Sequence, residues 1–181
     1  LRKLAESLCQ PLSFTRLCNM IKAVGVSCST STIIEYLNHF TDSCLIFSFQ
    51  NFASRFVEKA TTKKFYFVDN GLLNLFLLNN QSALLENICA IEMKKRYGTR
   101  LYYYLHNIEV DFYVPEENLA IQVSYKLADE NTIKRETDAL LKLHKLHPLN
   151  KAIIITKDEE KTITKNDLNI EFIPVWKWLL Q

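Results

Sequence analysis

The sequence predicts an α/β (α+β) protein: a small helical part with two strands, followed by a mixed sheet flanked by helices. Three observations predict this class. Apolar residues recur at helical spacing through residues 1–40. Short runs rich in aromatic and β-branched residues follow from residue 44 onward. A long amphipathic pattern over residues 131–147 then separates three of these runs from two others, which is typical of helices that flank a sheet.

Three helices and then a pair of strands are predicted in the first part of the chain. The helices are expected over residues 1–9, 14–23 and 31–40, and the strands over residues 44–49 and 64–68. Pro11 ends the first helix, and Ser13 is a good N-cap for the second. Three helices followed by a β-hairpin form the winged-helix arrangement, in which the helix from Ser31 would be the recognition helix.

The second part is predicted to contain two long helices, five strands and a short terminal helix. Helices are expected over residues 82–97, 131–147 and 175–180, and strands over residues 100–105, 109–114, 119–124, 151–156 and 170–174. Because Pro174 ends the last strand, we expect that strand at an edge of the sheet. Asp69-Asn70-Gly71 is a turn signal between the two parts. We therefore predict a winged-helix-like unit over residues 1–75 and a second unit over residues 76–181.

Composition excludes several classes of function. The 181 residues carry a net charge of +2, and no apolar run is long enough to span a membrane. The three glycines lie too far apart to form a Walker A loop or a dinucleotide fingerprint. The five cysteines form no Cys-x-x-Cys pair and are typical of a reducing cytoplasm, where we expect the protein to reside. The absence of an initiator Met suggests a fragment of a longer protein.

A mild excess of positive charge in the first part indicates a possible contact with DNA. It is held largely by four residues that lie between the two predicted strands or begin the second one: Arg55, Lys59, Lys63 and Lys64. Cations at such a place neutralise phosphates. The predicted recognition helix itself offers Thr32, Glu35, Asn38 and His39 and no Arg or Lys. The alternative is a scaffold that packs against neighbouring domains.

Two neighbouring strands carry a sparse set of polar residues. Asp111 lies on the strand over residues 109–114, and Gln122 and Ser124 lie on the next one. Residues i and i+2 of a strand share a face, so positions 122 and 124 are expected to project together beside Asp111. This order resembles the restriction-endonuclease-like fold with its Pro-Asp…(Asp/Glu)-x-Lys motif.

The resemblance implies a site for Mg²⁺ in active members. There the Asp and the Glu hold the metal ion and the Lys activates the attacking water. A Glu on the first helix often completes the site, and here Glu86 or Glu92 would take that place. In this chain Asp111 and Glu86 are therefore the possible metal ligands, while Gln122 has no charge and Ser124 cannot replace the Lys. We therefore interpret these residues as a vestigial nuclease site. The structural alternative for Asp111 is a strand-end residue bonded to backbone donors.

A further resemblance covers nearly the whole chain. Residues 64–73, with Tyr66-Phe67-Val68-Asp69-Asn70-Gly71-Leu72, look like the Tyr-Phe-x-Asp-x-Gly-Leu signature of a prokaryotic AAA-type ATPase family. Residues 84–87 look like its Leu-x-Glu-Asn helix start, and Glu109-Val110-Asp111-Phe112 like its Glu-Val-Asp-Phe strand. Residues 120–124 match its Ala-Ile-Glu-Val-Lys with two replacements.

In these ATPases of bacteria and archaea a P-loop module precedes a winged-helix unit and a restriction-endonuclease-like unit. The resemblance implies that ATP would bind only in an N-terminal domain absent from this chain, and that the chain itself carries no cofactor except Mg²⁺ if nuclease activity persists. We expect a non-catalytic module that binds DNA or a protein partner, including the ATPase domain of the same chain. The alternatives are a weakly active Mg²⁺-dependent nuclease and a structural or oligomerisation module.

Overall fold

The computed structural model describes residues 1–77, 80–126 and 130–181, and these residues form two compact units, Leu1–Ile91 and Glu92–Gln181. Helix α6 (Gln81–Tyr97) contributes its first residues to the first unit and its last residues to the second. The observed helices and sheets confirm the predicted α/β class. The predicted boundary after residue 75 stays a prediction. None of the helices in the described residues is long and apolar enough to cross a membrane.

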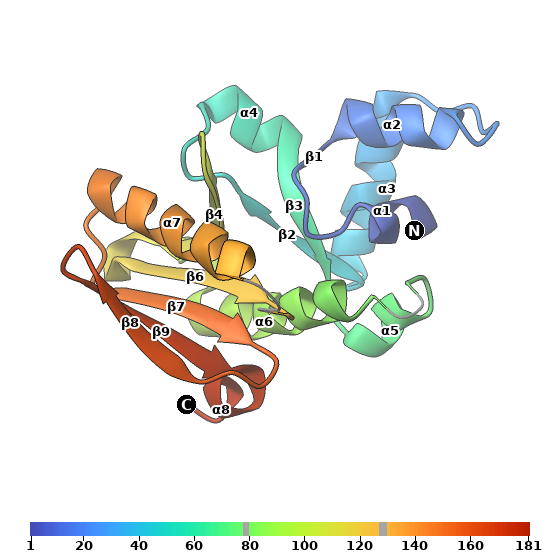
Figure 1. The fold of residues 1–181 in the computed structure, drawn as a ribbon. Coiled ribbons are helices and arrows are strands. Elements are labelled where there is room, and N and C mark those ends of the chain that lie inside the picture. The colour runs from blue at the N-terminus through green and yellow to red at the C-terminus, as the bar shows by residue number, and fades with distance from the viewer. Residues whose placement is uncertain (78–79, 127–129) are drawn as a thin grey trace. The chain divides into compact units, whose positions relative to one another are not determined.

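The first unit holds helices and a three-stranded sheet. Its elements, in chain order before α6, are α1 (Arg2–Glu6), β1 (Leu12–Ser13), α2 (Phe14–Lys22), α3 (Thr30–Asp42), β2 (Ile46–Gln50), α4 (Phe56–Thr61), β3 (Thr62–Phe67) and α5 (Asn70–Asn74). Strand β3 lies between β1 and β2 and is antiparallel to both (Figure 1). Ser13 caps α2 by accepting from the backbone N–H of Arg16, as the sequence predicts.

Two elements of the first unit escape prediction from sequence. Strand β1 is only two residues long, too short to show an alternation of apolar and polar side chains. Helix α4 falls in the stretch of mixed charge between the two predicted strands, and none of its residues is buried. A helix this short with no buried face shows no periodic apolar pattern in the sequence.

The second unit is built on a six-stranded mixed sheet. Its elements are β4 (Tyr102–Leu105), β5 (Glu109–Val114), β6 (Leu119–Ser124), α7 (Glu130–Leu146), β7 (Lys151–Thr156), β8 (Lys161–Lys165), β9 (Leu168–Pro174) and α8 (Val175–Leu179). Short helical turns lie at residues 98–100, before β4, and at residues 115–117, between β5 and β6. The strand order is β4-β5-β6-β7-β9-β8. Pairs β6–β7 and β7–β9 are parallel and the other pairs are antiparallel.

The expectation that the last strand lies at an edge is wrong. Strand β9 lies between β7 and β8, and the edge is β8, which the sequence did not predict. Pro174 is the final residue of β9 and pairs with Thr156 at the end of the ladder, so its missing N–H costs little there. The polar sequence Lys161-Thr162-Ile163-Thr164-Lys165 is typical of an edge strand, whose lysines oppose pairing with another chain.

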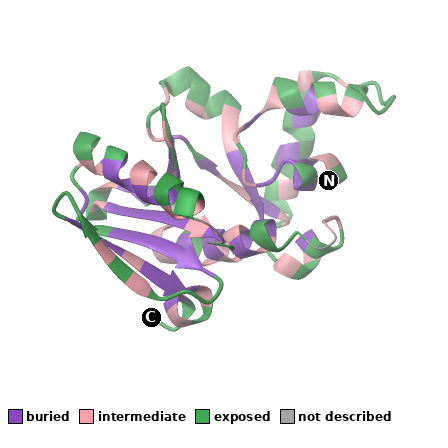
Figure 2. Cartoon of the chain, viewed as in Figure 1, coloured by how far each residue is buried: buried purple, intermediate pink, exposed green. Residues whose placement is uncertain are grey.

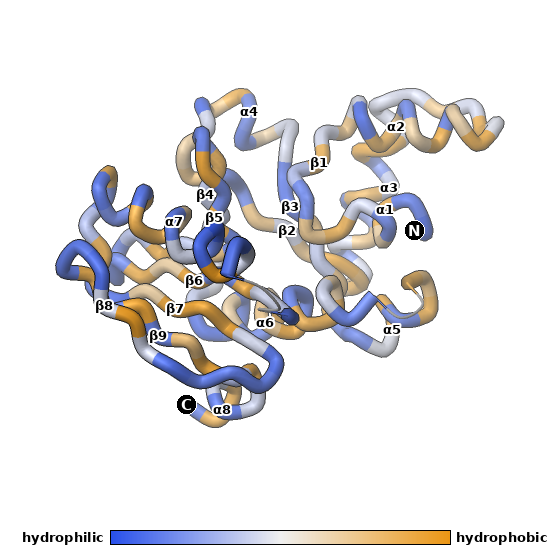
Figure 3. Tube along the Cα trace, in the orientation of Figure 1, coloured by the Kyte–Doolittle hydropathy of each residue, from blue (hydrophilic) through white to orange (hydrophobic). Residues whose placement is uncertain are grey.

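The core of the second unit lies on both faces of its central strands. Figure 2 shows buried residues along β6, β7 and β9, and Figure 3 shows hydrophobic residues along β7 and a more hydrophilic β8 at the edge of the sheet. Helix α7 packs against β5 and β6, while α8 packs against β7 and β9. Alternation along β6 points Gln122 toward α7 and Ile121 toward the cleft that Trp178 of α8 lines. The face covered by α7 therefore holds the polar residues singled out in the sequence.

Candidate functional site

Side chains replace the backbone ladder at one end of the β5–β6 hairpin. The paired residues run from Val114 and Leu119 to Phe112 and Ile121. At the next step, the Oε1 atom of Gln122 accepts the backbone N–H of Asp111 at 2.8 Å. The carboxylate of Asp111 in turn accepts the backbone N–H of Val123 at 3.0 Å. Each side chain thus binds the backbone of the opposite strand and holds the two strands together where the ladder stops.

The amide nitrogen of Gln122 makes two further hydrogen bonds. Its Nε2 donates to the carbonyl of Glu109 at 3.0 Å and to Oε2 of Glu136, on α7, at 3.0 Å. Gln122 and Glu136 are both buried. A glutamate at position 122 could make neither of these donations when ionised, because a carboxylate only accepts hydrogen bonds. The neutral amide is therefore built into the hydrogen-bonding scheme of the hairpin and α7.

Glu136 is the residue of this cluster that sequence reasoning missed. It lies three residues after Ile133 and four before Leu140, on the inward face of α7, and this position was the signal that could have found it. Its Oε1 accepts from Arg135 at 2.6 Å. Burial raises the pKa of Glu136, the hydrogen bond from Arg135 opposes the rise, and the charges of Asp111 and Glu109 add to it.

The raised pKa of Glu136 determines how this group changes the stability of the fold with pH. The folded state holds the proton more tightly than the unfolded state, so this group favours folding at acid pH. Its contribution is present below the pKa of an unfolded glutamate and is lost as the pH rises through the higher folded pKa. The hydrogen bond from Gln122 to the ionised carboxylate offsets part of that loss.

The residues at this end of the hairpin do not fit a Mg²⁺ site. Gln122 supplies no charge, and its side-chain oxygen accepts the backbone N–H of Asp111. One carboxylate oxygen of Asp111 accepts the backbone N–H of Val123. Ser124 is buried, and its hydroxyl donates to the carbonyl of Lys126 at 3.3 Å. Across residues 1–77, 80–126 and 130–181, no group of three or more His, Cys, Asp or Glu side chains is placed to hold a metal ion. A hard divalent cation requires several oxygen ligands and usually more than one carboxylate.

Glu86, the other proposed metal ligand, is partly buried in the first unit. Its Oε1 accepts the hydroxyl of Tyr66 at 2.9 Å and lies 3.7 Å from the Nζ atom of Lys64. The side chain of Lys64 is 0% exposed. A buried ammonium group this close to the carboxylate opposes the binding of a second cation there. Its contacts therefore give Glu86 a structural explanation that needs no metal.

Asn87 joins the two sequence signatures of the first unit. Its Oδ1 accepts the backbone N–H of Phe67 at 2.8 Å, and its Nδ2 donates to the carbonyl of the same residue at 3.0 Å. Nδ2 also donates to Oδ1 of Asn70 at 2.9 Å, and Asn70 donates to the carbonyl of Leu84 at 2.9 Å. The pattern around residues 64–73 and the pattern at residues 84–87 thus contact each other directly.

The Asp-x-Gly part of the first signature also has a local explanation. Asp69 is the N-cap of α5, and its side chain accepts the backbone N–H of Leu72 at 2.9 Å. A Cβ atom at position 71 would lie 2.8 Å from Oδ1 of Asp69. Glycine at this position therefore leaves room for the capping carboxylate. These contacts explain the signature by its role in holding β3, α5 and α6 together, and they assign it no catalytic role.

One of the four basic residues predicted to bind nucleic acid is buried, and the other three reach the surface. Arg55, which precedes α4, is exposed, Lys63 on β3 is half-buried, and Lys59 has its Nζ atom 5.6 Å from the centre of the Phe52 ring. Lys64 is buried against Glu86 and is not available to a phosphate. Arg55, Lys59 and Lys63 remain as the basic residues of this region.

Sequence reasoning also missed two apolar side chains beside these cations. Phe56 is 89% exposed and Val57 is 72% exposed, both in the first turn of α4. The signal was a Phe-Val pair that follows Arg55 in a stretch rich in polar residues. We call residues 46–67, from β2 to β3, the wing. Its connection between the strands thus presents cations and exposed apolar groups together.

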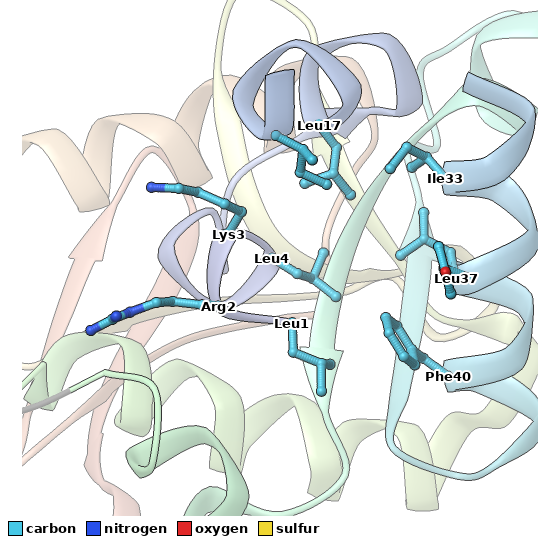
Figure 4. Close-up of a pocket in the computed structure, with 10 residues that line it drawn as sticks. Leu1, Arg2, Lys3, Leu4, Leu17, Ile33, Leu37 and Phe40 are labelled. Carbon is cyan, nitrogen blue, oxygen red and sulfur yellow. The ribbon is translucent and has the colours of Figure 1, made fainter. Parts of the chain in front are cut away.

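An apolar cavity of 360 Å³ lies among α1, α2 and α3. Figure 4 shows Leu4, Leu17, Ile33, Leu37 and Phe40 among the side chains that line it. Its two cationic lining residues, Arg2 and Lys3, are paired with Glu6. A catalytic or binding pocket needs a few convergent polar groups as well as apolar walls. This cavity therefore offers no arrangement for chemistry.

Comparisons with known proteins support a relationship and assign no activity. A family model described as "Domain of unknown function (DUF8612)" matches residues 1–83. The chain is 34% identical over 182 residues to the uncharacterized protein MJ1544 of Methanocaldococcus jannaschii. That match covers 93% of this chain and 41% of the relative, so the chain spans less than half of the relative's length. No solved structure matches the chain. The chain is thus similar to a domain of unknown function and to a longer archaeal protein.

Proposed function

We propose that this chain is a non-catalytic module of a cytoplasmic AAA-type ATPase and that it binds DNA through the wing. The observation that carries the non-catalytic part is the bonding of Gln122. At the position where an active nuclease would hold a metal-ligating glutamate, this chain has an amide that donates to Glu109 and Glu136 and accepts from Asp111. Replacing it would break a structural connection, so the position serves folding.

The element order supports the two fold types proposed for the units. In the first unit, helices α1, α2 and α3 precede β2 and β3, and a short β1 completes a three-stranded sheet, which agrees with a winged-helix arrangement. In the second unit, Asp111 and Gln122 lie on adjacent strands of a mixed sheet that helices flank, which agrees with a restriction-endonuclease-like unit. The greater length of the archaeal relative leaves room for an ATPase domain. A Walker A loop in the full-length protein would support the ATPase assignment, and its absence would remove it.

The wing is a better candidate for DNA contact than α3. Helix α3 carries Glu35 and Asp42 and no Lys or Arg, so it does not supply the cations that phosphates attract. Arg55, Lys59 and Lys63 are grouped on or beside α4. The exposed ring of Phe56 lies directly after Arg55, and aromatic rings stack on unpaired bases. Three phosphate contacts would give a slope of about −3 for the logarithm of affinity against that of salt concentration.

Reversing two charges of the wing is expected to weaken DNA binding by about tenfold or more at low salt. The variant is Arg55→Glu with Lys63→Glu, and it should also reduce the salt slope by about 2, because two phosphate contacts are lost. Lys64 is left unchanged because it is buried beside Glu86. Fluorescence anisotropy with a short duplex and with a single strand, over about 50–200 mM salt, measures both quantities.

The matched control is Lys142→Glu with Lys165→Glu, which makes the same change of charge at exposed positions of α7 and β8. It is expected to retain the wild-type salt slope. If both double variants bind DNA equally well, or if the wild type binds with no dependence on salt, DNA is not the partner of the wing.

A protein partner is the second candidate, and the exposure of Phe56 and Val57 favours it. Large apolar side chains that remain exposed in an isolated chain commonly mark protein contacts. In that case Phe56→Ser would abolish association with the ATPase domain, and the charge reversals would have little effect. A structural or oligomerisation module is the remaining alternative.

A further inference from the structure

Two cysteines of the first unit face each other at close range. Cys18 is buried on α2, and Cys28 is half-buried in the connection between α2 and α3. Their Sγ atoms are 3.4 Å apart. The Cys18 thiol also lies 3.4 Å from the carbonyl of Cys28, and the Cys28 thiol lies 3.6 Å from the carbonyl of Cys18. The two residues thus contact each other through both side chain and backbone.

This geometry is close to that of a disulfide. An S–S bond is about 2.05 Å long, so an approach of roughly 1.4 Å joins the two sulfur atoms. Residues 23–27, which carry the chain toward Cys28, are all exposed, and Gly25 has open space around its Cα atom. An exposed connection can make such a movement at little cost, because few packed side chains oppose it.

We propose that Cys18 and Cys28 form an intramolecular disulfide when the protein meets a low-molecular-mass disulfide oxidant, such as oxidised glutathione. In the first step the Cys28 thiolate attacks one sulfur of the oxidant, its proton goes to solvent, and one glutathione thiolate leaves. In the second step Cys18 loses its proton to solvent, its thiolate attacks the sulfur of Cys28, and the second glutathione thiolate leaves. The two glutathione thiolates take up the two protons from solvent. Two protein thiols are oxidised, and one external disulfide is reduced to two thiols.

The order of the steps follows from exposure. Cys28 is reachable from solvent and Cys18 is buried, so the external disulfide meets Cys28 first. Desolvation and the neighbouring Cys18 thiol raise the pKa of Cys28, which keeps it mostly protonated at neutral pH. The reaction of Cys28 is therefore slower than that of a thiol with an ordinary pKa, and it accelerates as the pH rises. Cys44 is exposed, which makes it a suitable internal reference for the reactivity of an accessible thiol.

Closure of this bond would fix the connection that positions α3. Cys28 directly precedes Ser29, the N-cap of α3, whose side chain accepts the backbone N–H of Thr32 at 3.1 Å. The bond would join that N-cap to α2 across ten positions of the sequence. We expect oxidation to raise the midpoint of thermal unfolding of the first unit, because a cross-link restricts the unfolded chain. The inference does not depend on the proposed function.

The test treats the full chain with oxidised glutathione, blocks the remaining thiols under denaturing conditions and identifies linked peptides by mass spectrometry. The expected result is a Cys18–Cys28 peptide pair and a fall in free thiol by these two of the five cysteines, counted separately from any mixed disulfide on the exposed Cys44 and reversed by a reducing agent. Cys28→Ser is expected to abolish this fall, and Cys44→Ser to leave the Cys18–Cys28 pair intact. A stable mixed disulfide on Cys28, five thiols remaining, or linkage of Cys18 to other cysteines in equal yield would overturn the proposal.

Discussion

Replacing Gln122 with glutamate is expected to destabilise the second unit by about 3 kcal/mol at about pH 8 and by much less at about pH 5. The ionised side chain would lose the hydrogen bonds that Gln122 donates to the Glu109 carbonyl and to Glu136. It would also place a second carboxylate beside that of Glu136. Two carboxylates that share a buried site raise each other's pKa. The folded state would then hold more protons than the unfolded state, so stability falls as the pH rises through the folded pKa values.

Both tryptophans, Trp176 and Trp178, belong to the second unit, so tryptophan fluorescence during urea unfolding reports on this variant. Gln50→Glu is the matched control, because it makes the same chemical change at an exposed position of β2. It is expected to alter the free energy of unfolding by less than about 0.5 kcal/mol. A Gln122→Glu variant with wild-type stability at both pH values would show that the amide does not hold the hairpin as described.

Replacing Asn87 with alanine is expected to destabilise the first unit by about 3–6 kcal/mol. The amide is 0% exposed and makes three hydrogen bonds, two to the backbone of Phe67 and one to Asn70. Truncation leaves the Phe67 N–H and carbonyl buried without these partners, and each such loss costs about 1–3 kcal/mol. The link between β3 and the first half of α6 would be lost.

Hydrogen exchange of the Phe67 amide is the direct measurement for Asn87, because this N–H donates to the side chain that is removed. Its protection is expected to fall sharply in Asn87→Ala. Asn74→Ala, at an exposed position of α5, serves as the control and should leave the protection unchanged. Equal protection of the Phe67 amide in both variants would show that the side chain of Asn87 does not hold β3 against α6.

Periodicity in the sequence was sufficient for most elements of the fold. The runs that became β5, β6 and β7 and the amphipathic helix α7 show their patterns clearly, because one or both of their faces are buried. Elements without a buried face, such as α4 and the edge strand β8, give no such signal. The error at Pro174 has the same origin, because the sequence does not reveal which strand lies next to β9.

The candidate site could be predicted only in part. Alternation along a strand places Gln122 and Ser124 on one face, but it does not identify Glu136 as the partner supplied by α7. The burial of Lys64 was equally hidden, because a lysine in a basic stretch usually reaches solvent. Contacts between residues far apart in the sequence, including Tyr66 with Glu86, decide the role of each polar group. A single sequence does not contain those contacts.

The most direct test of the central claim is a cleavage assay on plasmid, single-stranded DNA and RNA in the presence of Mg²⁺ or Mn²⁺. Wild-type protein and Asp111→Ala are compared at matched concentrations, and DNA retention is measured in the same samples. We predict that the wild type binds DNA in a salt-dependent manner and leaves every substrate intact. Cleavage by the wild type that disappears in Asp111→Ala would contradict the account and identify a surviving nuclease.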